Sequence, residues 1–344
     1  MKNRARDAPI TTGPPGTTPR KTPVQAILVE QIGDFRVADL PLPVLAPRDV
    51  LVRVRVTGLC RTDLKIVRSG HRDLVLPRVP GEEVVGVVAA VGPQVSRVRA
   101  GQRVYLYPGT SCGTCPACLR DAGNLCRSMQ IMGFHRDGGF AEYVATPEES
   151  IIGLPDSLAD DTAIFAEPLS CCLNALERAA LRPGDTVGIW GAGPAGMLLR
   201  RAAESQGAQV WTVEPDAARR ARIDGHLAPP AEGCDIAVVA VGNLAAYQQA
   251  LGALRPRGCL VLFSGLAPDL ACQPIDFNHL HYLEQRLAGA YGCTYAHSVA
   301  AIDLLASGRL RVDDLISHRL PLAELDTGLD IVERRAGMKV LLYP

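Results

Sequence analysis

The sequence predicts an α/β protein in which a β-rich, barrel-like domain precedes a domain built on a doubly wound parallel sheet. Its 344 residues exceed the usual size of a single hydrophobic core, so we expect two domains. Short apolar runs separated by Pro and Gly occupy the chain from Val24 to about Leu154. From about Pro155 to about Gly289, strand-like and helix-like segments alternate instead.

Each segment has a local reason for its assignment. Residues 23–154 contain the strand-like runs of the β-rich domain, namely QAILVE, VLVRVRVTGL, EVVGVVAAVG and RVYLYP. In residues 155–290 the alternation implies a parallel sheet with helices on both faces. Residues 291–344 contain a helical run and a last strand, and we expect them to return to the first domain. Residues 1–22 have almost nothing apolar to bury and predict a disordered leader.

Composition excludes several classes of function. Thirty-six basic residues balance thirty-six acidic ones, which leaves no net field to attract nucleic acid or an anionic membrane. The chain has no run of about 18 apolar residues and no apolar segment near its start that resembles a signal peptide. We therefore expect a cytoplasmic protein whose partner is a small molecule.

Four cysteines form one cluster, on a loop of about residues 109–127 that contains several Gly and Pro residues. They are Cys112, Cys115, Cys118 and Cys126. Such short spacings allow four thiolates to converge on a tetrahedral ion, which is typical of a structural zinc site. Redox disulfides or an iron–sulfur cluster are the alternatives. A reducing compartment and the absence of nearby electron-transfer features favour zinc.

A glycine-rich turn follows the apolar run TVGIW and precedes a helical segment. In GAGPAG, three glycines enclose Pro194 and Ala195. Gly191 permits the tight turn, Gly193 lets a pyrophosphate approach backbone amides, and Gly196 lets helix and strand pack closely. The turn therefore predicts a dinucleotide site.

The residues after this turn bear on the choice of cofactor. Glu214 ends the next strand, where a carboxylate can accept hydrogen bonds from the ribose hydroxyls and repel a 2′-phosphate. NAD is therefore favoured over NADP. Arg219 and Arg220 keep NADP possible, or they form a solvated helix face. The next strand, CDIAVVAVG, follows so soon that the third unit of the sheet must be abbreviated.

In their order along the chain, these features resemble the zinc-dependent medium-chain dehydrogenase/reductase superfamily, which includes alcohol, sorbitol and threonine dehydrogenases. The matching stretches are GLCRTD, PGEEVVGVV, the cysteine loop, GGFAEYV, AEPLSCCLNAL and GAGPAG. The resemblance implies an oxidoreductase with a GroES-like catalytic domain, a Rossmann domain, a structural zinc and a catalytic zinc between the domains. It also implies a homodimer or homotetramer, for which the strand CLVLFSG is expected to continue a sheet into a second subunit.

The resemblance also assigns roles to individual residues. Cys60 would bind the catalytic zinc, and Arg61 would contact the cofactor pyrophosphate. Thr62 would pass the substrate proton outward. Lys65 stands where many relatives place a relay histidine, and it either completes the proton path or is simply solvated. Glu167, in AEPL, would be a carboxylate of the metal site.

One motif departs from the family pattern. The family usually has Gly-His-Glu where this chain has Gly81, Glu82 and Glu83. A site of Cys60, Glu82 and Glu167, with Glu83 nearby, can still bind zinc, but its negative charge overcompensates the dication and weakens its Lewis acidity. Three outcomes are therefore open: zinc binds with altered strength, an oxygen-preferring metal replaces it, or the position is empty.

Together these features predict reversible, NAD-dependent and zinc-assisted oxidation of a secondary alcohol to a ketone. The resemblance favours a polar substrate such as a polyol, sugar, cyclitol or aminocyclitol. The alternative is a family member with a lost or altered catalytic metal, acting either as a non-catalytic NAD-binding protein or as a metal-independent reductase. In that reductase, Lys65 or His135 would supply the proton. His71 and His135 are the upstream histidines that could compensate for the missing imidazole.

Overall fold

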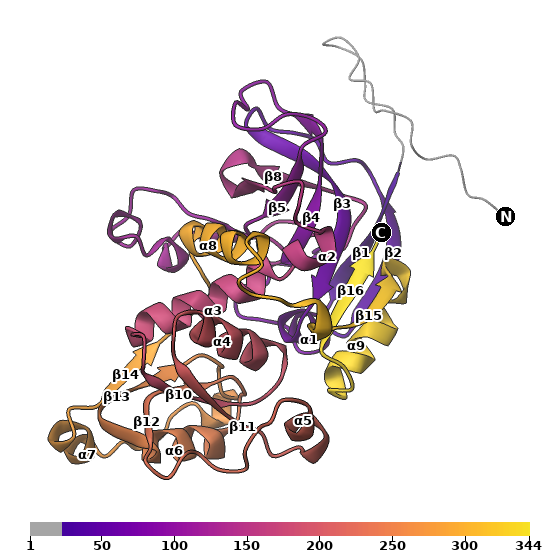
Figure 1. Cartoon of the computed structure of the whole chain (residues 1–344). Helices are drawn as coiled ribbons and strands as arrows, with labels where there is room; N and C mark the ends of the chain where they lie inside the picture. Colours follow the sequence, from indigo (N-terminus) through magenta and orange to yellow (C-terminus); the bar gives the residue numbers. More distant parts are fainter. Residues whose placement is uncertain (1–22) are drawn as a thin grey trace.

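The computed structural model describes residues 23–344, and the predicted leader lies outside the described residues. Two sheets organise the chain, one at each end of the molecule (Figure 1). The C-terminus lies close to the first strands of the described chain, so the last segment returns to the domain in which the described residues begin (Figure 1). This arrangement confirms the predicted α/β class with a β-rich domain and a doubly wound domain.

The sheet of the β-rich domain combines strands from both ends of the chain. Its order is β15-β16-β3-β4-β5-β9, and β8 also pairs with β3. Two short antiparallel pairs, β1 with β2 and β6 with β7, lie beside it. The strands of this domain are β1 (Val24–Gln31), β2 (Asp34–Leu40), β3 (Asp49–Leu59), β4 (Glu83–Val91), β5 (Arg103–Leu106), β6 (Gly109–Thr110), β7 (Gln130–Ile131), β8 (Tyr143–Pro147), β9 (Ile151–Gly153), β15 (Ile316–Pro321) and β16 (Lys339–Tyr343).

The second sheet is parallel throughout, in the order β11-β10-β12-β13-β14. Its strands are β10 (Thr186–Trp190), β11 (Gln209–Val213), β12 (Cys234–Val239), β13 (Leu254–Leu262) and β14 (Arg286–Gly289). Between β11 and β12 there is one short helix and a single bridge of Val213 to His226, so the third unit is abbreviated as predicted.

One expectation about this sheet is wrong. The first four residues of the run CLVLFSG form the end of β13, which pairs with β12 on one side and with β14 on the other. The backbone N–H and C=O groups of this run are therefore already hydrogen-bonded within the sheet, so the run cannot continue the sheet into a second subunit. The edge strand on this side is β14, whose run RLAG is too short and too polar at its start to have stood out in the sequence.

Alternating side chains bury both faces of the parallel sheet. On β12, Ile236 and Val238 pack toward the cluster that contains α3 and α4, while Ala237 and Val239 pack toward α6. Such two-sided burial is what the continuous apolar runs require. The helices are α1 (Arg61–Arg68), α2 (Asp160–Ala163), α3 (Ala166–Ala179), α4 (Pro194–Ser205), α5 (Ala217–Arg222), α6 (Leu244–Gly252), α7 (Phe277–Tyr282), α8 (Tyr295–Ala306) and α9 (Leu325–Glu333).

Helix α3 joins the two domains. It crosses the middle of the molecule between the sheets, with α8 packed on one side and α4 on the other (Figure 1). One hydrophobic cluster runs from Val56 and Tyr105 of the β-rich domain, through Leu169 of α3, to Val187 and Val238 of the parallel sheet. Side chains on the first turns of α3 are therefore held against both domains. Within residues 23–344, none of the helices is long and apolar enough to cross a bilayer.

Candidate active site

The glycine-rich turn connects β10 to α4 in the geometry that a dinucleotide requires. Gly191 has φ +107°, a conformation that side-chain-bearing residues rarely adopt. Gly193 caps α4 and Pro194 occupies its first turn, so the amides of Ala195 and its neighbours point out of the helix N-terminus. A Cβ at Gly196 would lie 1.9 Å from the carbonyl oxygen of Gly191. The turn thus offers free N–H groups and a positive helix end to an anionic phosphate.

The acidic residue after β11 supports this turn directly. The Glu214 carboxylate accepts hydrogen bonds from the backbone N–H of Ala192 at 2.8 Å and of Asp216 at 3.0 Å. The Arg220 guanidinium folds back onto the carbonyl oxygen of Glu214 at 2.9 Å. The Arg219 guanidinium lies beside Gly193 and donates to the carbonyl of Arg335. Of the two arginines, Arg219 is therefore the one close to the predicted pyrophosphate position.

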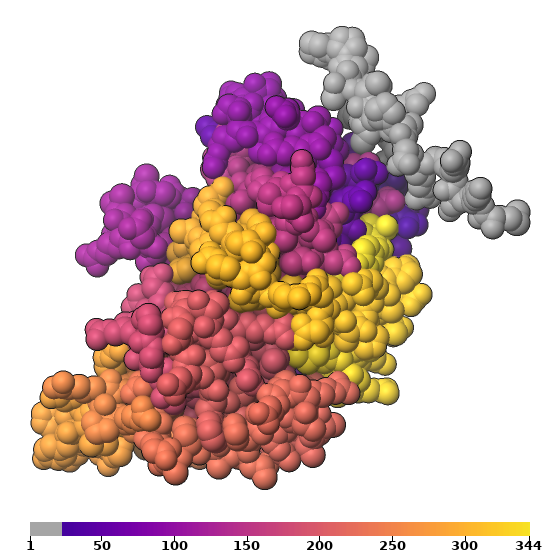
Figure 2. All heavy atoms as spheres, in the orientation of Figure 1, coloured from indigo at the N-terminus to yellow at the C-terminus, as the bar shows by residue number. Residues whose placement is uncertain are grey.

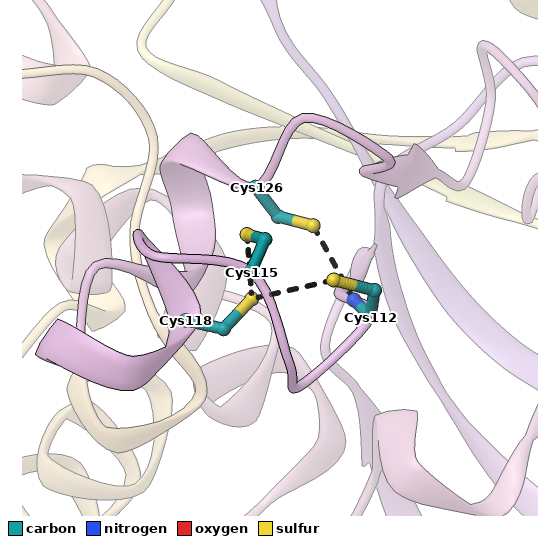
Figure 3. A group of neighbouring side chains, drawn as sticks. All are labelled: Cys112, Cys115, Cys118 and Cys126. Carbon is teal, nitrogen blue, oxygen red and sulfur yellow. Dashed lines mark hydrogen bonds between the residues drawn. The ribbon is translucent and has the colours of Figure 1, made fainter.

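The four clustered cysteines converge in a lobe that projects from the body of the molecule (Figures 2 and 3). Their sulfur atoms all lie within 4.8 Å of one another, with 3.5 Å between Cys115 and Cys118 and 4.0 Å between Cys112 and Cys118. A tetrahedral zinc with bonds of about 2.3 Å spaces its sulfur ligands about 3.8 Å apart. The hydrogen bond from the backbone N–H of Thr114, followed by that from its hydroxyl, lowers the pKa of Cys112 to about 6. This donor set fits a closed, structural zinc.

Replacing Cys118 by serine should lower the zinc content by one ion per chain and open the lobe to proteolysis, because a hydroxyl cannot substitute for a thiolate ligand. Atomic emission spectrometry and limited proteolysis at residues 109–127 measure these effects. Cys272→Ser is the matched control, since Cys272 is exposed and lies outside the cluster. Full zinc content in Cys118→Ser would contradict the assignment.

Strand register places a buried ion pair directly beside Cys60. Gly58 of β3 lies opposite Glu83 of β4, and Leu59 lies opposite Val340 of β16. The Glu83 carboxylate therefore meets the ammonium group of Lys339, and the two residues are only 1% and 3% exposed. A Cβ at Gly58 would lie 1.8 Å from a Glu83 oxygen, so the glycine makes room for the pair.

Helix α1 begins after Cys60. The backbone N–H of Cys60 donates to the carboxylate of Asp63 at 2.9 Å. Burial, and next the charge of Asp63, raises the pKa of the Cys60 thiol well above its ordinary value. Asp63 keeps one buried carboxylate oxygen without a hydrogen-bond partner. Arg61 and Lys65 are exposed on α1, while Thr62 is half-buried.

The remaining predicted metal ligands, Glu82 and Glu167, are both half-buried. Burial, and next the charge of Glu167, raises the pKa of Glu82 well above the usual carboxylic range. Burial, and next the charge of Glu83, raises the pKa of Glu167 to about 7. Within the described chain, however, no three of Cys60, Glu82, Glu83 and Glu167 have their donor atoms within 4.8 Å of one another. The metal site of these four residues remains a prediction, and the present side-chain positions do not form it.

The structure brings Glu167 together with two residues that the sequence did not single out. The sulfur atoms of Cys171 and Cys293 lie within 4.8 Å of each other and of the Glu167 carboxylate. The spacing of Glu167 and Cys171 by one helical turn was a usable sequence signal. Cys293 gave none, because its loop reaches α3 only through the tertiary fold.

The side chains of the two upstream histidines, His71 and His135, already interact with nearby residues of the protein. The Nδ1 atom of His135 accepts a hydrogen bond from the backbone N–H of Ile131 at 3.1 Å, as in an ordinary loop. His71 packs against the ring of Phe134 at 4.9 Å, and burial lowers its pKa. No group of three potential metal ligands in residues 23–344 includes either histidine.

A β-rich domain, a parallel sheet with a glycine-rich turn suited to a dinucleotide, and a four-cysteine lobe together form the architecture of a two-domain dehydrogenase fold. Residues 46–156 match the alcohol dehydrogenase GroES-like domain. The chain is 31% identical to a D-altritol 5-dehydrogenase of Agrobacterium fabrum, covering 88% of this chain and 94% of that protein. It is 29% identical to the sorbitol dehydrogenase of Bacillus subtilis, covering 93% and 97%.

A solved structure agrees with these relatives. A zinc-binding dehydrogenase of Sinorhizobium meliloti 1021, bound to NADP, superposes with a TM-score of 0.86 at 29% identity, over 94% of this chain and 100% of that one. The chain therefore belongs to the zinc-dependent medium-chain dehydrogenase superfamily, whose members oxidise CH–OH groups. The predicted family, fold and enzyme class are confirmed.

Proposed function

We propose that this enzyme oxidises a secondary alcohol of a polar, polyhydroxylated substrate to a ketone with NAD, in a reversible reaction. The β10–α4 turn carries the proposal, because its glycines and the N-terminus of α4 suit a pyrophosphate. The Glu214 carboxylate accepts a hydrogen bond from this turn. Glu167 lies in the first turn of α3, the helix that packs against both domains. The named activities of the altritol and sorbitol relatives support a polyol, and sugars, cyclitols and aminocyclitols share its chemistry.

Different residues of the cofactor site are expected to bind different parts of the dinucleotide. The turn of Gly191, Gly193 and Gly196 presents amides to the pyrophosphate, and Arg219 adds a cation beside it. Glu214 retains free lone pairs for the ribose hydroxyls while it braces the turn. Its negative charge disfavours a 2′-phosphate, so we propose NAD over NADP. When bound, the nicotinamide supplies the hydride acceptor.

We assign proton transfer to two residues of α1, Thr62 and Lys65. Thr62 lies half-buried in its first turn, and Lys65 lies exposed one turn later, so the two residues share a side of the helix. The Thr62 hydroxyl can accept the substrate proton and donate its own outward, and Lys65 is the side chain at the solvent end of that path. A zinc ion at the domain junction, with Glu167 among its ligands, would supply charge stabilisation to the substrate oxygen.

The test is cofactor reduction across a panel of polyols, sugar acids, aminocyclitols, L-threonine and simple primary alcohols. We expect kcat/KM for at least one polyhydroxylated substrate to exceed that for the primary alcohols by about 100-fold, equivalent to about 2.7 kcal/mol. Turnover of primary alcohols alone would contradict the proposed substrate class.

The cofactor preference has its own test in Glu214→Gln, which keeps the size of the side chain and removes its charge. The amide nitrogen cannot accept one of the two backbone hydrogen bonds, but that loss affects both cofactors and cancels in their ratio. We expect the preference for NAD over NADP to fall by about 10-fold, because the repulsion of the 2′-phosphate is lost. The ratio of the kcat/KM values for the two cofactors measures the effect. A wild-type enzyme that prefers NADP would contradict the assignment of Glu214.

A further inference from the structure

An arginine and a tyrosine from distant parts of the chain are in contact. Arg72 lies in the loop after α1, and Tyr291 lies in the loop between β14 and α8. The guanidinium carbon of Arg72 is 5.4 Å from the centre of the Tyr291 ring, within the range of a cation–π interaction. The Asp73 carboxylate accepts hydrogen bonds from Nε of Arg72 at 3.3 Å and from the Tyr291 hydroxyl at 3.4 Å. These three residues, here called the guanidinium cluster, connect the β-rich domain to the loop that leaves the parallel sheet.

The tyrosine of this cluster lies on a loop that other residues hold in place. The side-chain amide of Asn124, in the cysteine lobe, donates to the carbonyl of Tyr291 at 2.7 Å. The side-chain amide of Asn174, on α3, donates to the carbonyl of Gly292 at 2.9 Å. The Tyr291 ring therefore gives the flat guanidinium a fixed surface to lie against, which orients the N–H donors of Arg72.

A series of contacts connects the guanidinium cluster to Glu82, which stands where the family pattern has a histidine. A Cβ at Gly133 would lie 3.6 Å from Cγ of Glu82. The next residue, Phe134, packs edge-on against the ring of His71, with 4.9 Å between the ring centres. The Nδ1 atom of His71 accepts a hydrogen bond from the backbone N–H of Asp73 at 3.2 Å. The cluster thus lies on the side of the β-rich domain that carries Glu82.

Strand order places the cluster at the nicotinamide end of the predicted cofactor site. Parallel α/β sheets bind their ligands beyond the carboxyl ends of the strands. Glu214, after β11, is expected to bind the adenosine ribose, and the turn after β10 the pyrophosphate. The rest of the dinucleotide then extends past β12 and β13 toward β14. Tyr291 lies two residues beyond the end of β14, so we expect the substrate near this residue.

We propose that Arg72 binds a carboxylate of the substrate, and that the enzyme prefers a sugar acid to the uncharged polyol of the same carbon chain. The proposal rests on the proposed dehydrogenase function and narrows its substrate class. A guanidinium offers five N–H donors in a planar fork that matches a carboxylate. Asp73 takes the Nε donor, which leaves donors for a ligand. The Arg72 side chain is 73% exposed, so a ligand has access to it.

The charges near Arg72 favour an anion. Burial lowers the pKa of His71; Asp73 opposes this effect, while the charges of Arg72 and Lys65 add to it. The imidazole is therefore neutral at pH 7, and two cations accompany one carboxylate around this loop. An uncharged polyol makes no use of the excess positive charge, whereas a sugar acid neutralises it.

The test compares sugar acids with the polyols of the same carbon chain, such as gluconate with sorbitol and galactonate with galactitol. We expect kcat/KM for at least one sugar acid to exceed that for its polyol, and the ratio to fall at least about 10-fold in Arg72→Gln, because an amide lacks the charged fork. Arg68→Gln is the matched control. Arg68 ends α1 and donates to Asp326 instead, so the ratio should not change.

Asp73→Asn separates substrate binding from a purely structural contact. This variant and Arg72→Gln break the same ion pair. Asp73→Asn, however, removes the carboxylate that competes for the guanidinium, so the ratio of kcat/KM values should rise by about 3-fold. A contact that served only to hold the two loops together would leave the ratio unchanged in both variants, and that result would overturn the proposal.

Calorimetric titration of the enzyme–NADH complex with the same sugar acids measures binding without turnover. We expect Arg72→Gln to bind the preferred sugar acid at least about 10-fold more weakly, with unchanged affinity for NADH. The proposal is overturned if no sugar acid binds, if the polyols bind as tightly, or if Arg72→Gln weakens NADH binding equally. Binding of a sugar acid that depends on Arg72 but leads to no oxidation would support this assignment and contradict only the proposed reaction.

Discussion

Replacing Lys339 by methionine should destabilise the protein by about 3–5 kcal/mol, because it leaves the Glu83 carboxylate unpaired in a buried position. The pair connects β16 to β4 beside Cys60, so its loss should also loosen the return of the C-terminal segment to the first domain. Although burial opposes it, the charge of Glu83 raises the pKa of Lys339, so the ammonium group stays protonated at neutral pH. Chemical denaturation at fixed zinc concentration measures the loss.

Two further variants identify the cause of that loss. Arg36→Met breaks an ion pair with Glu30 that is about half exposed, and it should cost at most about 1 kcal/mol. Glu83→Gln combined with Lys339→Met removes both charges and should be more stable than Lys339→Met alone. If the double variant were no more stable, the unpaired carboxylate would not be the source of the destabilisation.

Replacing Gly196 by alanine should weaken NAD binding by at least about 10-fold, equivalent to about 1.4 kcal/mol. The new Cβ would lie 1.9 Å from the carbonyl oxygen of Gly191, so α4 must move away from β10 and carry its N-terminal amides with it. The same displacement should lower stability by about 1–3 kcal/mol. Calorimetric titration with NAD and thermal unfolding measure the two effects.

Gly252→Ala is the control for this substitution. Gly252 ends α6, and a Cβ there would meet nothing within 4 Å. Alanine at this position should leave NAD affinity unchanged and alter stability by less than about 1 kcal/mol, because it adds helix propensity without a clash. Equal losses of NAD affinity in both variants would contradict the role assigned to close packing at Gly196.

Features that depend on neighbouring residues were predictable from the sequence. The GAGPAG turn needs only a strand, a positive φ at Gly191 and a helix start, all within a few residues. The cysteine lobe closes within residues 112–126, so its spacing alone indicated a metal site. The abbreviated unit after β11 followed from the short distance to the next apolar run.

Features that depend on contacts between segments distant in the sequence were not predictable in the same way. Apolar alternation identified β13 as a strand but did not reveal that β14 would cover its free side. Lys339 and Glu83 are 256 positions apart, and only the register of β16 and β4 against β3 brings them together. The family resemblance directed attention to Cys60 and Glu82, whereas the fold gathers Cys171 and Cys293 around Glu167.

The amino-acid order by itself therefore determined the two kinds of sheet, the glycine-rich turn and the cysteine lobe, because each is encoded by residues close to one another along the chain. The tertiary structure alone decided which strand forms the sheet edge, which cation neutralises Glu83 and which thiols accompany Glu167. Those outcomes depend on strand register and on the docking of a distant loop against α3, and neither has a local signal in the sequence.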